Sequence, residues 1–278
     1  MGFFLPRRRQ RRDADKDREK RSKIEGPVCG QSLSVTILTR NSSQTLRATL
    51  LSLQKFPEVI LYDSGSTDQT LEIARSFPNV RIHQGPFQGF GPAHNAASAL
   101  ATHDWILSID SDEVVTPELA EEILKLRLDA SCVYQLDRKN YFNGKWIRGC
   151  GGWYPDPVLR LYHRNSTRFS DDAVHERILT QGLRLQPLAA PLHHTPYRSF
   201  SDFLHKMEHY STLFAQQNRG KRPSSVLSAV SHGLFAFLKS YILKRGFLSG
   251  KEGFIISAYN GQCTFYKYLK LMEHNARE

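Results

Sequence analysis

Three carboxylates occupy four positions in "LSIDSDEVV", residues 107–115. Asp110, Asp112 and Glu113 directly follow an apolar run, and strands packed in a sheet do not usually end in so much like charge. Because like charges repel, the cluster requires a positive partner nearby. Mg²⁺ and Mn²⁺ are candidates, since they prefer hard oxygen ligands and share their sites with substrate phosphates.

A second acidic position follows a different apolar stretch. Asp63 opens "DSGSTDQT", where Gly65 permits a tight turn and the hydroxyl residues supply short hydrogen-bonding groups. Each motif alone has a structural explanation: a capping turn for Asp63, a solvated strand end for Asp110 and Asp112. Ligands of parallel α/β sheets bind beyond the carboxyl ends of the strands, where both motifs are expected. Together they predict a divalent cation, Mg²⁺ or Mn²⁺, that holds a diphosphate.

The elements that must position these residues alternate between strands and helices. Strand signals occur at residues 33–38, 58–63, 80–84 and 105–110. Helix signals follow each of them: an apolar stripe from Leu46, a capping box of Ser66 and Gln69, small residues behind Gly91-Pro92, and a Thr116-Pro117 start. Strands separated by such helices indicate βαβ units. The predicted fold class is therefore α/β, with a mostly parallel sheet flanked by helices.

Three regions are predicted along the 278 residues. Residues 1–23 hold ten Arg or Lys and four acidic residues, so +6 of the net charge of +11 lies there. Composition predicts a basic, disordered leader over residues 1–30. Residues 31–198 are expected to form the α/β domain, and residues 199–278 a helical C-terminal appendage.

Targeting and redox signals are sparse. The four cysteines form no CxxC pair, which indicates neither a zinc site nor a disulfide framework. The leader lacks the apolar stretch of a secretory signal. The most apolar run, residues 226–243, is interrupted by His232 and Lys239, so a membrane-spanning helix is not expected. A cytosolic protein is the simplest interpretation.

The order of the motifs resembles a known family. "VTILTRN", "LYDSGSTDQT", "GPAHNAASALA" and "DWILSIDSDE" are similar to the nucleotide-sugar domain of family 2 glycosyltransferases, which have the GT-A fold. The resemblance covers about residues 33–180. It implies that Thr39 lines the nucleotide pocket, that Asp63 contacts the uracil of UDP and that Asp110 lies near the ribose. It also implies that Asp112 coordinates the metal on the diphosphate.

Beyond these motifs the chain resembles the lipopolysaccharide inner-core β-1,4-glucosyltransferases. The similarity is carried by "GGWYPDPVLRLYHR", "AVHERI", "HHTPYRSFSDFLHKMEHY" and "GFIISAYNGQCTFYKYLKL". It implies transfer of a hexose from a UDP-sugar donor, UDP-glucose, to a heptose of a lipid-linked glycan acceptor. It also implies a peripheral position on the cytosolic face of the inner membrane. The leader is not part of this pattern, and the Glu-Asp and Gln-x-x-Arg-Trp motifs of processive synthases are absent, which favours addition of a single sugar.

Inversion at the anomeric carbon needs one base on the acceptor hydroxyl, while a metal can stabilise the leaving diphosphate. Glu176 in "VHERI" is the first candidate for the base, with His175 beside it. Asp171 and Asp172 are alternatives. His175 and Glu176 could instead be an exposed pair after a strand.

Further candidates on the acceptor side come from the loop and strand before Glu176. Trp153 and Asp156 lie in "GCGGWYPD", which is expected to reach over the diphosphate end; Trp153 would stack on a sugar or anchor the loop. Arg160 would clamp a phosphate or form a structural ion pair. His193 and His194 are predicted to be a structural pair.

The C-terminal region mixes aromatic and basic residues, a combination found in helices that lie at membrane interfaces. The predicted partner is the inner-leaflet membrane surface. The alternative is that these aromatic residues cover the catalytic domain.

Three other functions are compatible with parts of the sequence. A polyprenyl-phosphate or other glycan glycosyltransferase would keep the fold and change the acceptor. A nucleic-acid-binding protein would use the Arg-rich leader, but the leader has no aromatic residue after Phe4, so no nucleic acid is expected. A sugar nucleotidyltransferase would need an N-terminal Gly-rich loop bearing an arginine, which the sequence lacks.

Overall fold

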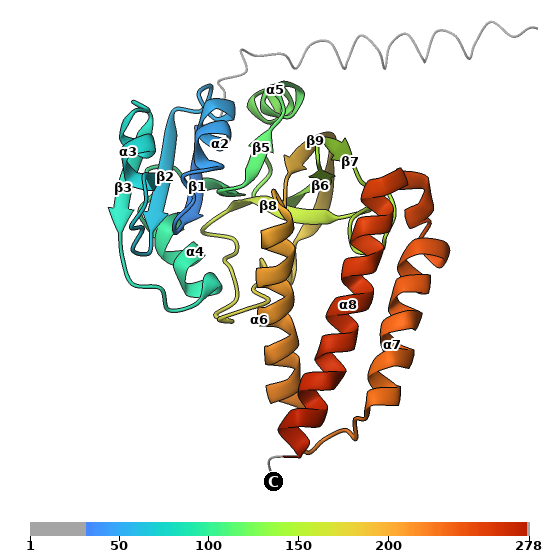
Figure 1. The fold of residues 1–278 in the computed structure, drawn as a ribbon. Coiled ribbons are helices and arrows are strands. Elements are labelled where there is room, and N and C mark those ends of the chain that lie inside the picture. Colours follow the sequence, from blue (N-terminus) through green and yellow to red (C-terminus); the bar gives the residue numbers. More distant parts are fainter. Residues whose placement is uncertain (1–31, 277–278) are drawn as a thin grey trace, which may run out of the picture.

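The computed structural model describes residues 32–276 (Figure 1). A large sheet flanked by helices is followed by three long helices that project from one side of it. The basic leader predicted for residues 1–30 lies outside the described residues.

The first four strands form the parallel half of the sheet, in the order β3-β2-β1-β4. They are β1 (Leu33–Thr39), β2 (Glu58–Asp63), β3 (Val80–Gln84) and β4 (Trp105–Asp110). The register pairs Thr39 with Asp63 and Leu38 with Asp110, so these carboxyl ends meet at one edge. The predicted α/β fold is confirmed.

Four helices connect and cover these strands. They are α2 (Leu46–Ser52), α3 (Thr70–Arg75), α4 (Phe90–Ala99) and α5 (Pro117–Lys125). Figure 1 shows α2 and α3 on one side of the sheet and α4 on the other. The predicted start of α5 is confirmed, since the Thr116 side chain accepts a hydrogen bond from the Leu119 N–H. The predicted capping box is wrong: α3 begins at Thr70 without a side-chain cap at Gln69, because the Ser66 hydroxyl donates to Asp63 instead.

The remaining strands make the sheet mixed. They are β5 (Glu113–Val115), β6 (Cys132–Phe142), β7 (Lys145–Trp146), β8 (Pro157–His163) and β9 (Arg184–His194). β8 joins the parallel half by antiparallel pairing with β4, and β6 pairs antiparallel with β8 but parallel with β9. The prediction of a mostly parallel sheet therefore holds for β1–β4 and is wrong for this half, where all pairings except that of β6 with β9 are antiparallel.

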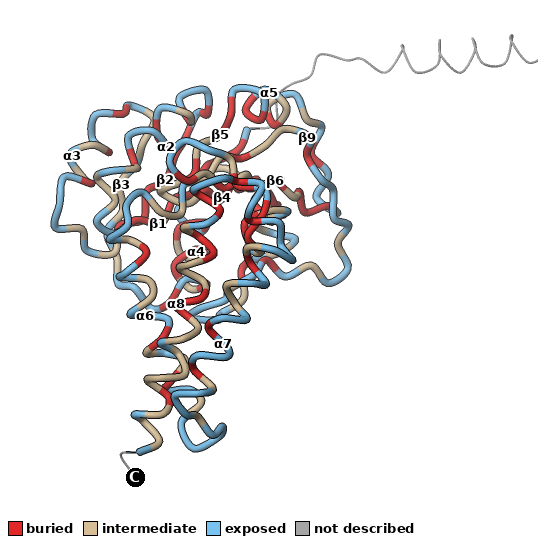
Figure 2. The backbone as a smooth tube through the Cα atoms, turned by 45° about the vertical axis from the view of Figure 1, so that its right-hand side comes forward, coloured by how far each residue is buried: buried red, intermediate tan, exposed pale blue. Residues whose placement is uncertain are grey.

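The buried residues gather on both faces of the sheet, as Figure 2 shows. Leu50, Phe56 and Tyr134 are at most 1% exposed and belong to the larger cluster, on the side of α2, α3 and α5. Tyr162 and Phe169 belong to a cluster on the opposite face. Fully burying each large apolar side chain contributes about 1.5–3 kcal/mol, so these two layers fix the strand ends that carry the acidic residues.

The C-terminal helices pack against one another and dock on the sheet. They are α6 (Phe200–Asn218), α7 (Val226–Leu238) with a π-helical turn η1 (Lys239–Leu243), a short 3₁₀ helix η2 (Gly246–Ser249), and α8 (Gly250–Asn275). α7 and α8 approach closely at Gly233 and Gly261, where a Cβ on Gly233 would lie 3.1 Å from the Gly261 carbonyl oxygen. The Cys150 N–H donates to the Lys244 carbonyl at 3.0 Å, which ties the Gly-rich loop to η1.

One stretch among the described residues, Val226–Leu243, is long and apolar enough to cross a membrane. It consists of α7 and η1, and 17% of it is buried. A single such helix is weak support for a membrane span, and His232 and Lys239 lie within it.

Candidate functional site

A cavity of about 330 Å³ lies at the carboxyl ends of β1 and β2. Its lining includes Thr39 from β1, Tyr62 from β2, Phe90 and Ala93 from α4, and Ser111. The Thr39 side-chain hydroxyl is buried and has no hydrogen-bond partner among the described residues. A buried polar group without a partner is costly, so this hydroxyl indicates a polar ligand in the cavity.

Asp63 lies at the end of β2 and is 0% exposed. Its carboxylate accepts hydrogen bonds from the N–H groups of Gly65 and Ser66, from the Ser66 hydroxyl and from the Gln84 amide. Burial alone would raise the pKa of Asp63, but the bonds from Ser66 and Gln84 hold it below its usual range. These contacts are those of the capping turn, and the predicted contact with uracil stays a prediction.

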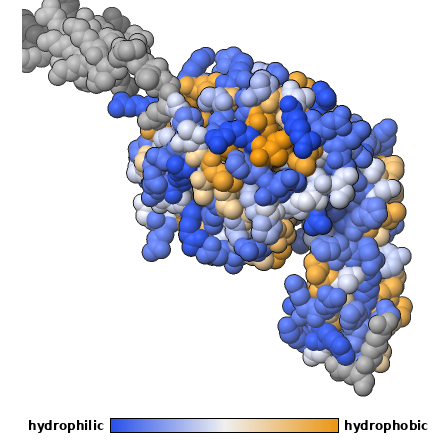
Figure 3. Space-filling view, turned by 90° about the vertical axis from the view of Figure 1, so that its left-hand side faces the viewer, coloured by the Kyte–Doolittle hydropathy of each residue, from blue (hydrophilic) through white to orange (hydrophobic). Residues whose placement is uncertain are grey.

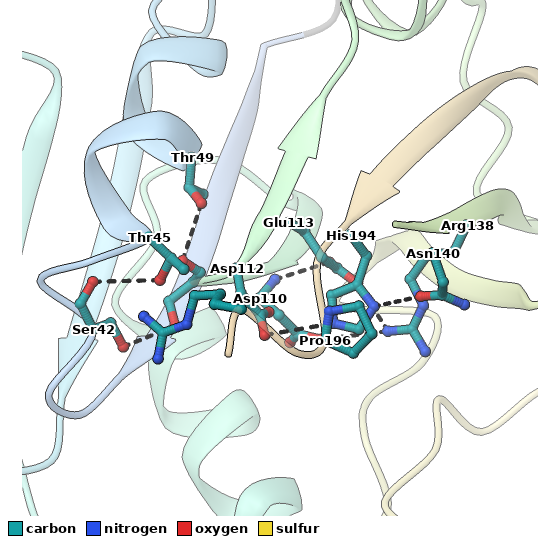
Figure 4. Close-up of polar contacts among 12 residues, drawn as sticks. Ser42, Thr45, Thr49, Asp110, Asp112, Glu113, Arg138, Asn140, His194 and Pro196 are labelled. Carbon is teal, nitrogen blue, oxygen red and sulfur yellow. Dashed lines mark hydrogen bonds and ion pairs between the residues drawn. The ribbon is translucent and has the colours of Figure 1, made fainter. Parts of the chain in front are cut away.

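The other acidic cluster lies against two arginines, Arg138 and Arg160; Figure 4 shows Arg138 beside Asp110 and Glu113. One Arg160 nitrogen donates to both Asp110 and Glu113, with 2.7 Å to the Glu113 oxygen. Arg138 donates to the same Glu113 oxygen at 3.0 Å and lies 3.8 Å from Asp110. Glu113 is 0% exposed and also accepts the Asp110 N–H at 2.9 Å, so it fixes the turn after β4.

The positive partner of Asp110 and Glu113 is therefore a pair of arginines and not, as the sequence suggested, a metal ion alone. Burial alone would raise the pKa of Asp110, but the charges of Arg160 and Arg138 hold it below its usual range. Arg160 forms the structural ion pairs that the sequence left as an alternative. Its Nε atom is buried and has no partner among the described residues, and its contact with a phosphate stays a prediction.

Asp112 points away from the arginines and faces His194, the last residue of β9. The His194 Nε2 atom lies 3.4 Å from a carboxylate oxygen of Asp112, and His194 Nδ1 lies 2.6 Å from the Asn140 side-chain oxygen. The Asn140 amide nitrogen donates to the Trp153 carbonyl at 2.7 Å and to Asp156 at 2.8 Å, which fixes the orientation of the amide. His194 therefore donates from Nδ1 and presents Nε2 to Asp112.

The loop residues predicted for the acceptor side lie behind this pair. Asp156 accepts hydrogen bonds from Arg138 at 2.8 Å and from Asn140 at 2.8 Å. Trp153 is 7% exposed and packs against Phe142 and Tyr197, with ring centroids 6.5 Å and 5.8 Å away. These contacts are those of a loop anchor, and stacking of Trp153 on a sugar stays a prediction.

Glu176 lies on the other side of the arginines, close to α4. Its carboxylate is 4.0 Å from His94 Nε2, while His94 Nδ1 lies 3.2 Å from the Ser108 hydroxyl. Burial holds the pKa of His94 at about 4, so this imidazole is neutral at pH 7. Burial also raises the pKa of Glu176, and the nearby Asp110 charge adds to that rise. A carboxylate with a raised pKa is typical of a general base.

The alternatives to Glu176 make other contacts. Asp171 is exposed and forms a two-pronged ion pair with Arg168 at 2.6 and 2.9 Å. Asp172 is exposed and accepts the Ser170 hydroxyl at 2.8 Å. His175 is exposed, with a positive φ of 63°. Of these four, Glu176 is the one that faces His94 and the buried arginine cluster.

The loop that carries Glu176 is held by the first turn of α4. The Phe90 and Gly91 N–H groups donate to the carbonyls of Ala173 and Asp172 at 3.0 and 3.1 Å. A Cβ on Gly91 would lie 1.9 Å from the Ser170 carbonyl oxygen, so this close approach requires glycine. α4 therefore has two roles: its residues line the cavity, and its first turn positions the loop that carries Glu176.

Sequence reasoning missed three residues that the structure brings to this site: Arg138, Asn140 and His94. Arg138 and Asn140 alternate in β6, which places both on one face; a polar pair two residues apart in a strand is a signal that could have found them. For His193 and His194 a structural pair was preferred over ligand binding, and the structure places His194 against Asn140 and Asp112.

Comparison with known proteins identifies the family of this chain. The model of "Glycosyl transferase family 2" matches residues 34–183, which contain every predicted site residue. The lipopolysaccharide core biosynthesis glycosyltransferase LpsC of Rhizobium meliloti is 26% identical over 258 residues, covering 88% of this chain and 93% of LpsC. An uncharacterized glycosyltransferase of Rickettsia bellii is 26% identical, covering 87% of each chain.

Among solved structures, S. aureus TarS (residues 1–349) in complex with UDP-GlcNAc aligns with a TM-score of 0.44 at 17% identity, covering 88% of this chain and 89% of that one. The family model covers more than half of this chain, and its range contains both acidic strand ends and Glu176. The chain therefore belongs to glycosyltransferase family 2.

Proposed function

We propose that this enzyme is an inverting, metal-dependent hexosyltransferase that uses a UDP-sugar donor, UDP-glucose, and a lipid-linked glycan acceptor. One observation carries the proposal: Asp112 and His194 face each other, and Asp112 directly follows Ser111, which lines the same cavity as Thr39, whose hydroxyl has no partner among the described residues. The nucleoside would occupy that cavity, with its diphosphate directed past Ser111 toward Asp112.

The donor set fits a divalent cation. The His194 Nδ1 atom faces the Asn140 side-chain oxygen, so Nε2 is directed at a carboxylate oxygen of Asp112, 3.4 Å away. An imidazole nitrogen and a carboxylate oxygen are both ligands that a divalent transition-metal cation accepts. No group of three or more His, Cys, Asp or Glu side chains that could hold a metal is present in residues 32–276, so substrate oxygens would complete the coordination. A bound Mg²⁺ or Mn²⁺ would supply charge stabilisation for the leaving diphosphate.

Glu176 would act as the base that removes the proton from the acceptor hydroxyl. His94 Nε2 lies 4.0 Å from this carboxylate, and because His94 is neutral at pH 7 it adds no positive charge that would lower the basicity of Glu176. Arg138 and Arg160 keep Asp110 ionised and hold the turn that positions Asp112.

The acceptor would be a heptose of the lipopolysaccharide inner core. The similarity to LpsC, whose name places it in lipopolysaccharide core biosynthesis, supports this choice over a polyprenyl phosphate. The sequence resemblance to inner-core glucosyltransferases supports glucose as the sugar that is transferred.

The enzyme would work at the inner-leaflet surface, peripherally bound through its C-terminal helices. Leu227, Leu234 and Leu243 are 78%, 58% and 69% exposed along α7 and η1, and Leu248 in η2 is 68% exposed. Figure 3 shows hydrophobic side chains among hydrophilic ones on the projecting helical part. Basic residues accompany these leucines near η1 and η2: Lys239, Lys244, Arg245 and Lys251. Exposed apolar residues with basic neighbours suit a surface of anionic lipid.

Leu243→Asp combined with Leu248→Asp is expected to lower binding to phosphatidylglycerol-containing vesicles by at least about tenfold. Each leucine that leaves water for lipid contributes about 1.5–3 kcal/mol, and both side chains are exposed, so the fold should survive. Co-sedimentation of the full chain at high salt, where contacts of a basic leader are screened, measures this. Leu185→Asp, at a 53% exposed position on β9, is the control. Unchanged sedimentation of the double variant would reject these helices as the membrane contact.

A transfer assay tests the proposed function. The purified enzyme would be incubated with UDP- and GDP-hexoses, with and without Mn²⁺, and with lipopolysaccharide from a strain that lacks the gene. We expect the core to gain the mass of one hexose with UDP-glucose and Mn²⁺. A core of unchanged mass with every donor would overturn the acceptor assignment, and hydrolysis of GDP-sugars alone would overturn the donor.

A further inference from the structure

A second cavity, of about 250 Å³, lies between the α/β part and the start of α6. Ser42, Ser111 and Asp112 line one side of it. Arg198, His205 and Lys206 line the other, and they belong to the segment after β9. The family model ends at residue 183, so it assigns no role to these three basic side chains.

Lys206 is the least exposed of the three basic residues and lacks a carboxylate partner. Its Nζ donates to the Pro196 carbonyl at 2.9 Å and lies 4.4 Å from the centre of the Tyr197 ring. Among the described residues, no carboxylate lies within ion-pair distance of Nζ; Asp202 is engaged by Arg198 instead. Burial lowers the pKa of Lys206, and Asp112 and Asp202 oppose that effect from a greater distance.

The two cavities share part of their wall. Ser42 and Ser111 line both, and their hydroxyl oxygens are 2.9 Å apart. A ligand in the first cavity that extends past these hydroxyls therefore reaches Asp112 and the basic side of the second cavity. The Ser42 backbone is held in place by the Thr70 hydroxyl at 2.7 Å, so this shared wall is fixed by α3.

We propose that the second cavity binds phosphate oxygens and that Lys206, from α6, is the cation that holds them. The inference rests on the proposed function, which places a diphosphate next to Asp112. A half-buried ammonium group has lost part of its hydration and is stabilised by an anion, and the neighbouring Asp112 would share that anion through a metal ion. The phosphate belongs either to the donor diphosphate or to a phosphorylated acceptor.

Lys206→Met tests this assignment, because it removes the charge and keeps the apolar stem over Tyr197. We expect the affinity for inorganic pyrophosphate, titrated with Mg²⁺ present, to fall by roughly ten- to hundredfold. Lys206→Arg should retain most of the binding, which separates loss of charge from loss of packing. Lys267→Met is the matched control, since Lys267 also lies over an aromatic ring, that of Phe214 at 5.6 Å.

The two sources of phosphate give different results. If the donor diphosphate occupies the site, Lys206→Met weakens UDP about as much as pyrophosphate and leaves uridine unchanged. If the acceptor supplies the phosphate, UDP affinity is unchanged and the KM for phosphorylated, but not dephosphorylated, lipopolysaccharide rises.

Pyrophosphate binding that is equal in the native enzyme, Lys206→Met and Lys267→Met would overturn the proposal. The pyrophosphate titration does not depend on sugar transfer. A failure of the proposed function would therefore appear separately, because the native chain would then bind neither UDP nor uridine.

Discussion

Replacing Glu176 by Gln is expected to slow sugar transfer by roughly 10²–10⁴-fold while donor affinity stays within about twofold of the native value. The amide keeps the size and position of the side chain but cannot accept the proton of the acceptor hydroxyl. Glu176 lies 4.0 Å from His94 and does not line either cavity wall that would hold the nucleotide, so donor binding should survive. Single-turnover transfer and a separate UDP titration measure the two effects.

The pH dependence of sugar transfer by the native enzyme should report the ionisation of Glu176. A base must be deprotonated, so activity is lost as pH falls through its pKa. Burial and Asp110 raise the pKa of Glu176, which places this loss above the ordinary value of about 4.3 for a glutamate. Other charged groups face it: Arg160 and His175 oppose the rise. Glu176→Gln should abolish the acid limb of the profile.

Asp171→Asn serves as the matched control for Glu176→Gln. Asp171 is on the same loop, but its carboxylate is bound to Arg168 at the surface, so its loss should change transfer little. Near-normal transfer by Glu176→Gln together with a large loss for Asp171→Asn or Asp172→Asn would move the base to one of those residues.

The parallel half of the fold could be predicted because its signals are local. Each of the first four strands is a short apolar run rich in β-branched residues, and the predicted bounds of β2 and β3 agree with those in the structure. Thr116 and Pro117 mark the start of α5 by a mechanism that involves neighbouring residues alone. Ser66 shows the limit of such reasoning: its hydroxyl could cap a helix or bind Asp63, and the buried carboxylate had the stronger need for a donor.

β9 could not be predicted from its own residues. It contains Pro187 and Pro191, which cannot donate to a sheet, and prolines normally argue against a central strand. Its parallel pairing with β6 shifts register between Gln135 and Asp137, which are the partners of Pro187 and Pro191. Prolines are tolerated at such irregularities, but which strand would pair with residues 184–194 depends on segments far away in the sequence.

For the site as well, local signals could be read from the sequence and pairings between distant segments could not. Asp110 and Asp112 were found because carboxylates after an apolar strand are visible in one short segment. Their partners come from distant segments: Arg138 is 25 residues from Glu113, and Arg160 is 50 from Asp110. A pairing over such distances depends on the order of strands β4, β8 and β6, which becomes known with the fold.

Asp112→Ala is expected to lower transfer by at least about 10³-fold, because charge stabilisation of the leaving diphosphate by a bound metal contributes several kcal/mol. Asp112 lines the second cavity and faces His194 Nε2 at 3.4 Å, so its loss removes one of the two protein ligands that we propose for the metal. The arginine cluster beside it does not use the Asp112 side chain, and the fold should therefore be kept.

Metal binding should be measured directly as well as activity. With UDP present, the native enzyme should bind Mn²⁺, as seen from the loss of the free-ion electron paramagnetic resonance signal. Asp112→Ala should abolish this binding. Asn140→Leu should weaken it by roughly 10- to 100-fold, because Asn140 fixes the His194 ring without touching the metal.

Asp104→Ala is the control for Asp112→Ala, because Asp104 precedes β4 and Asp112 follows it. Asp104 pairs with Arg164 at 2.9 Å on the surface, an ion pair that contributes at most about 1 kcal/mol to stability. Asp104→Ala should therefore leave both transfer and Mn²⁺ binding near their native values. Full activity in chelator-treated enzyme would show that the negative charge of Asp112 does not serve a metal. His194 would then be a structural partner of Asp112, and its replacement by Gln would cost stability and leave the rate of transfer unchanged.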